Sequence, residues 1–253
     1  MVSKIFKRYA ALTGLTRALV QTLTIIAVAI VLLSGIFYTL TNAEDFAPTA
    51  WFWMWERFDV AAEVNFASMY GATLWLLLSA ITAFVGVLAD RKRGNWFFFS
   101  AVAAYAALDE ATILHEQLYL LGDYIRAYIP LTMVSYTWVI VGVLQAIIVS
   151  FFSLPLLVKL PRGVQLGLIV GGTVFLLGAV VMETIGGHIE MHFMGQVTWH
   201  LRLEIHLEEL FEYLGVIIAI GAVSQMLLVE KTAQSVKLGF RVYRGHEAKQ
   251  LTV

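Results

Sequence analysis

Six long apolar segments constrain this chain more than any other feature of its sequence. A helix needs about 20 mainly apolar residues to cross the hydrocarbon core of a bilayer, and all six segments meet that requirement. Hydrophobic residues make up 60% of the chain and charged residues 14%, against about 25% charged residues in soluble domains. The predicted spans are 17–40, 63–89, 95–121, 131–157, 164–187 and 203–229. The sequence therefore predicts a single all-α membrane domain, a bundle of six transmembrane helices.

Both ends of the chain carry basic residues. Lys4, Lys7 and Arg8 precede the first apolar segment, as they would in a secretory signal peptide. The apolar run is longer than a typical signal core, which favours a retained membrane anchor. The last segment is followed by a basic tail, residues 230–253, which is expected to lie in the cytoplasm against anionic lipid.

Charge and cysteine content limit the possible partners and chemistries. The formal net charge of −1 predicts no nucleic-acid partner. The chain has no cysteine, which excludes disulfides, thiolate metal sites and a cysteine nucleophile. Membrane lipid is the expected partner. A lipid-soluble or other small-molecule substrate and an oligomeric state are compatible with the sequence.

The distribution of charge predicts the orientation in the membrane. With the N-terminus inside, all but three of the 17 Lys and Arg residues fall on the cytoplasmic side, the exceptions being Arg57, Arg126 and Arg202. All but three of the 18 acidic residues lie in outer loops or within the spans. The sequence therefore predicts a plasma-membrane protein with both termini in the cytoplasm and an acidic region that opens toward the periplasm or cell exterior.

Acidic residues also occur inside the predicted spans. The third span contains the run LDEATILHEQL at Leu108–Leu118, and a continuous helix would place Asp109 and Glu116 on one face. The sixth span carries glutamates at four-residue intervals. One charged residue at a helix centre costs about 2.5–3.5 kcal/mol on insertion scales, and such residues usually mark function. We therefore expect a bound cation or shared protons to neutralise these acids.

Carboxylates combined with imidazoles favour a divalent transition metal (iron, zinc or copper) over calcium, which prefers oxygen ligands alone. His188 and His192 have the spacing of two ligands on one helical turn, although Gly186 and Gly187 leave open whether the helix continues. The predicted metal ligands are Glu63, Glu110, His115, Glu183, His188, His192, Glu208, Glu209 and Glu212. The predicted catalytic residues are Asp109 and Glu116, with Glu116 as general base for a metal-activated water.

Other polar and aromatic residues are predicted to be surface features. Solvation on the outer side is the prediction for Glu56, Asp59, Glu190 and Glu204. A polar position at the membrane interface is predicted for His200 and His206. The aromatic run at 51–55 is expected to lie in the same interface.

Four pieces of the chain resemble a group of uncharacterised bacterial multi-pass membrane proteins. Those proteins combine an E-x-N helix start, a D-E…H-E span and a closing E-E…E…G span. The matching pieces are AEVNFAS at Ala62–Ser68, LDEATILHEQL at Leu108–Leu118, METIGG at Met182–Gly187 and LEELFEYLG at Leu207–Gly215. The resemblance covers spans two to six and gives weight to these positions, but it implies no activity.

The first functional hypothesis is an intramembrane metalloprotein, an oxidoreductase or hydrolase that acts on a lipid or another membrane-soluble substrate. Ferritin-like bundles also collect carboxylates around metals, but they use Glu-x-x-His pairs that this sequence lacks.

The second hypothesis is a proton- or cation-coupled transporter or channel. The lack of an internal repeat and the scarcity of polar residues in the inner halves of the spans weigh against it. A b-type haem protein that uses His115 with His188 or His192 is a further alternative. An accessory subunit of a membrane complex is another.

Overall fold

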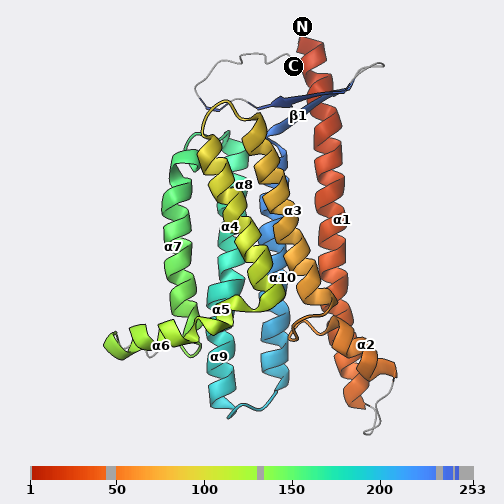
Figure 1. Ribbon diagram of the computed structural model, residues 1–253. Coiled ribbons are helices and arrows are strands. Elements are labelled where there is room, and N and C mark those ends of the chain that lie inside the picture. The colour runs from red at the N-terminus through yellow and green to blue at the C-terminus, as the bar shows by residue number, and fades with distance from the viewer. Residues whose placement is uncertain (1, 44–49, 130–133, 232–235, 242, 245–253) are drawn as a thin grey trace.

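Long helices run side by side through most of the molecule, and short elements lie at their ends (Figure 1). The computed structural model describes residues 2–43, 50–129, 134–231, 236–241 and 243–244. The helices are α1 Val2–Ala43, α2 Ala50–Phe58, α3 Phe66–Leu88, α4 Arg93–Thr112, α5 Leu114–Gln117, α6 Tyr119–Tyr128, α7 Trp138–Leu157, α8 Arg162–Leu176, η1 Leu177–Met182, α9 Glu183–His192 and α10 Trp199–Ser224. The strands are β1 Leu227–Lys231 and β2 Val236–Phe240.

Several of these helices are long and apolar enough to cross a membrane. Four helical stretches meet that condition, namely Gly14–Asn42, Phe66–Leu88, Trp138–Leu157 and Arg162–His192. The bent pair of α4 with α5 and α6 makes a fifth if it is counted as one span. Helix α10 runs beside these helices in the bundle, but its first half carries acidic residues (Figure 1). The all-helical architecture predicted for a membrane protein is thus confirmed, and the number of six spans stays a prediction.

The third predicted span, 95–121, is not one straight helix. Helix α4 ends at Thr112, and the chain bends by 85° before it continues to Tyr128. The residue at the bend is Ile113, whose φ of 57° lies in the left-handed region and whose backbone N–H bonds to the Asp109 carbonyl at 2.7 Å. Helix α6 therefore points sideways from the bundle (Figure 1). The predicted stripe that joined Asp109 and Glu116 along one helix was wrong.

The sixth predicted span also ends earlier than expected. Helix α10 stops at Ser224, and the next residues form an antiparallel hairpin in which Leu227 pairs with Phe240. Beyond the hairpin, the Tyr243 hydroxyl accepts a hydrogen bond from the Trp96 indole of α4 at 2.8 Å. The first part of the predicted basic tail is therefore folded against the helices, while residues 245–253 lie outside the described part of the chain.

Glycines allow α8 and α10 to pack closely. A Cβ added at Gly215 would lie 2.5 Å from the backbone nitrogen of Phe175 and 2.7 Å from the carbonyl oxygen of Gly171. Such contacts let backbones approach in a membrane bundle, where small residues at helix interfaces favour association. The same helical column continues from α8 through η1 into α9, which runs through Gly186 and Gly187 without a break. The column brings Glu183 beside the first half of α10.

A buried ion pair ties α10 to the opposite side of the bundle. The Arg202 guanidinium donates a hydrogen bond to Asp59 Oδ1 at 2.8 Å, and it lies over the rings of Tyr38 at 4.8 Å and Trp55 at 5.3 Å. The Asp59 residue is only 5% exposed. The prediction that Asp59 is solvated on the surface was therefore wrong, because Arg202 pairs with it and two aromatic rings cover the pair.

We expect Asp59→Ala to destabilise the protein by about 3–5 kcal/mol, because the change leaves the buried Arg202 charge without its partner. The measurement is the loss of folded protein with temperature in detergent. The matched control is Asp123→Ala, which breaks the exposed pair of Asp123 with Arg126 and should cost less than about 1 kcal/mol. Equal effects of the two changes would contradict the assignment.

Candidate functional site

Acidic side chains from four parts of the chain interact with one another. They come from the turn before α3, the junction of α4 and α5, the start of α9 and the first half of α10. We call these residues the acid cluster. Its members, each of which interacts electrostatically with at least one other, are Glu63, Asp109, Glu110, His115, Glu116, Glu183, Glu204, Glu208, Glu209 and Glu212. The cluster holds every predicted catalytic or metal-binding residue except His188 and His192.

Carboxyl groups on α9 and α10 hydrogen-bond one another. Glu208 bonds to Glu183 across the two helices and to Glu204 one turn earlier on its own helix. An ionised carboxylate has only acceptor oxygens, so a bond between two carboxyl groups requires a proton on one of them. The three glutamates therefore form a row in which neighbouring acids can share a proton.

The middle of the cluster lies between α3, α4 and α10. The Tyr213 hydroxyl donates to the carbonyl of Ala67 at 3.1 Å, and Tyr213 interacts electrostatically with Glu209. The Glu110 side chain lies against Gly71, where an added Cβ would overlap its carboxyl group. Glu110 and Glu212 both interact electrostatically with Glu209. Gly71 thus gives the carboxyl group of Glu110 its place against α3.

The bend after α4 joins a histidine to the cluster. His115 Nδ1 lies 3.1 Å from Asp109 Oδ2, although a straight helix would not bring residues six apart together. The other carboxylate oxygen of Asp109 is buried without a partner. The strained backbone of Ile113, between the two residues, therefore creates the pair.

The turn before α3 brings Glu63 to the outer edge of the cluster. The next residue, Val64, has a φ of 58°, and Asn65 then caps α3 by accepting hydrogen bonds from the backbone of Ala67 and Ser68. Partial desolvation raises the pKa of Glu63, and neighbouring Glu116 and Asp109 add to this effect. Val64 and Ile113 are both β-branched, and such residues rarely adopt positive φ. Strain of this kind clusters at functional sites.

Two contacts of the site were not predicted from the sequence. Glu204 was expected to be solvated, but it is only 4% exposed, because it packs where Gly186 leaves room on α9. Its Oε1 is buried without a partner. Glu190, also expected to be solvated, accepts a hydrogen bond from the Tyr136 hydroxyl. Burial and this bond raise the pKa of Tyr136. Gly186, which faces Glu204, could not have indicated this burial beforehand, because a single sequence does not show which helices pack against each other.

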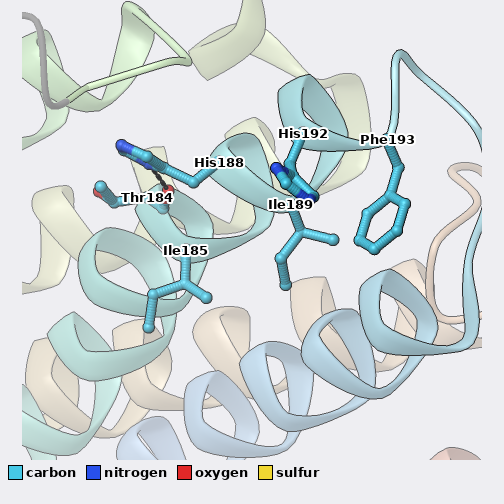
Figure 2. A pocket seen from close by; sticks show the side chains of 6 residues that line it. All are labelled: Thr184, Ile185, His188, Ile189, His192 and Phe193. Carbon is cyan, nitrogen blue, oxygen red and sulfur yellow. Dashed lines mark hydrogen bonds between the residues drawn. The ribbon is translucent and has the colours of Figure 1, made fainter.

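His188 and His192 do not join the acid cluster. Both are exposed on the outer face of α9, where they stand beside a groove (Figure 2). The groove is lined by Thr184, Ile185, His188, Ile189, His192 and Phe193. The nine predicted metal ligands are therefore divided between the buried cluster and this surface.

The described part of the chain shows no group of three or more His, Asp or Glu side chains arranged to hold a metal ion. The cluster side chains interact electrostatically with one another and with Tyr213. A metal site built from the predicted ligands stays a prediction.

One comparison with known proteins gives a match. The family described as domain of unknown function DUF8692 matches residues 22–226, a range that extends from within α1 to the end of the bundle and includes the acid cluster. None of the curated proteins and none of the solved structures matches the chain.

We expect Glu212→Gln to keep the fold and to stabilise the protein by about 0.5–2 kcal/mol. The change preserves the shape of a side chain whose electrostatic neighbours Glu209, Glu110, Glu183 and Asp109 are all acids, and it removes the possibility of repulsion. Thermal unfolding in detergent gives the measurement. The control Glu56→Gln, at an exposed position, should change stability by less than about 0.5 kcal/mol. A clear loss of stability in Glu212→Gln would show that the fold needs this carboxylate.

Proposed function

The chain belongs to the family described as domain of unknown function DUF8692. From the geometry of the chain we propose that it is a membrane protein with six spans. In this proposal the acid cluster binds and releases protons and is the coupling site of a transporter. The sixth span in this proposal is α10. Both termini lie in the cytoplasm, and the cluster opens to the periplasm or cell exterior. The support for this orientation is the gathering of basic residues in the segments assigned to the cytoplasm.

The observation that carries the proposal is the close approach of the carboxyl groups of Glu183, Glu208 and Glu204. Two carboxyl groups can approach each other closely when one of them carries a proton that it donates to the other. Chains of Asp, Glu and His residues serve as proton relays in membrane pumps and transporters.

The cluster also has an exposed edge and a half-buried interior. Glu63 and Glu116 are exposed, and both interact electrostatically with His115. His115 in turn pairs with Asp109, which interacts with Glu110 in the interior. In the proposal, protons enter at the exposed acids and pass through His115 and Asp109 to the buried glutamates. The positive-φ residues Val64 and Ile113 are the points at which the entrance would change shape.

We expect infrared spectra of the purified protein at neutral pH to show the C=O stretch of protonated carboxyl groups, with a shift in D2O. The band should lose intensity in Glu208→Gln, because Glu208 takes part in both carboxyl–carboxyl bonds. Glu56→Gln is the matched control and should leave the band unchanged, because Glu56 is exposed. A wild-type spectrum with only ionised carboxylates at neutral pH would overturn the proposal.

A metal-dependent enzyme is the second candidate, and one feature favours it. Asp109, His115, Glu63 and Glu116 interact electrostatically at the edge of the cluster, and one oxygen of Asp109 is buried without a partner. Small movements of these side chains would offer carboxylate and imidazole ligands to iron, zinc or copper. Glu116 would then be the base for a metal-bound water, acting on a lipid substrate.

For this second candidate we expect elemental analysis of the purified protein to find one or two metal ions per chain. The variant His115→Ala should lower that content, because it removes the imidazole of the edge group. Protein that lacks stoichiometric metal, purified without chelators, would remove the candidate and leave the first proposal standing.

A further inference from the structure

Two histidines stand in line on a surface that the acid cluster does not use. His188 and His192 are four residues apart on α9, so they lie one above the other on the same face of the helix. Both side chains are exposed, and Figure 2 shows their imidazoles on the same side of α9 as Ile185 and Ile189. Helix α9 lies at the end of the bundle opposite the β hairpin (Figure 1).

A backbone hydrogen bond fixes the tautomer of His188. Its Nδ1 lies 2.8 Å from the carbonyl oxygen of Thr184, one turn earlier on α9. A carbonyl can only accept, so Nδ1 carries the hydrogen and Nε2 has a free lone pair. Metal-binding histidines almost always donate their second ring N–H to a carbonyl or carboxylate, which fixes the tautomer and the ring. This bond is independent of the sequence spacing and points to the same ligand.

The surroundings leave space for the rest of a coordination shell. The groove beside the two rings has a volume of about 560 Å³ and is otherwise lined by Thr184 and apolar side chains. Water molecules or an external ligand can occupy it. The acids of α9 lie on the other side of the helix, where Glu183 contacts Glu208 and Glu190 accepts a hydrogen bond from Tyr136.

We propose that His188 and His192 bind one divalent late-transition-metal ion at the surface of α9, with water completing the coordination. Imidazole suits copper, nickel and zinc, and Cu²⁺ binds most tightly among the divalent first-row ions. The site is separate from the acid cluster and does not depend on the function proposed for it.

The test uses full-length protein, purified in detergent without a polyhistidine tag, stripped with chelator and titrated with CuCl2 alone. We expect one Cu²⁺ per chain, with nitrogen couplings from imidazole in its electron paramagnetic resonance spectrum. Each of His188→Ala and His192→Ala should weaken binding about 10-fold or more, because loss of even a supporting partner of a metal ligand costs about that much.

Two controls separate this site from other sources of binding. His200→Ala removes an exposed histidine whose ring stacks on Trp199 with 3.7 Å between centroids, and it should leave Cu²⁺ binding unchanged. Glu208→Gln disturbs the acid cluster and should also leave Cu²⁺ binding unchanged, whatever its infrared spectrum shows. Copper binding that survives in the double variant His188→Ala/His192→Ala, or that is lost in Glu208→Gln, would overturn the proposal.

Discussion

The burial of many carboxyl groups against one another is the constraint on which the rest of the structure depends. Removing an ionised carboxylate from water costs several kcal/mol unless a partner or a proton compensates. Three kinds of neighbour compensate for this desolvation within the cluster. They are other carboxyl groups, Tyr213 and His115. These partners lie on α5, α9 and α10, so the packing of these helices positions the groups that compensate the acids.

Glycines in the walls of the cluster show this dependence most directly. Gly71 faces the carboxyl group of Glu110, Gly186 faces Glu204, and Gly178 faces the Glu212 side chain and the Glu208 backbone. A side chain at any of these positions would occupy the space that an acid now fills. Glycines at these positions therefore have two effects. They let helices approach closely, and they leave space for the acidic side chains. By contrast, Gly172 on α8 has open space around it.

The sequence predicted the helices well, because long apolar runs can only cross a bilayer as helices or closed barrels. It also predicted which acids would meet, since Asp109, Glu110, Glu183 and Glu209 all lie in one half of their helices. It could not predict that Ile113 bends the chain, because a β-branched residue in the left-handed region goes against its local preference. The antiparallel pairing of β1 with β2 was missed, because the apolar run of α10 extends into β1.

The remaining wrong predictions concern the side of a helix on which a residue lies. His188 and His192 share α9 with Glu183, yet they face outward and Glu183 faces α10. One sequence gives the angle between residues on a helix but not the direction of the bundle axis, so it could not separate the two groups.

The same geometry explains why the acid cluster is left without an arginine. Arg202 and Glu204 are two residues apart on α10, which places them about 200° apart around the helix. Arg202 therefore faces α1 and α2, where Asp59, Tyr38 and Trp55 enclose it, and Glu204 faces Gly186 on α9. The buried pair with Asp59 thus has a consequence beyond stability. It holds the Arg202 guanidinium on the side of α10 away from Glu204, so this charge pairs with Asp59 and not with the acid cluster.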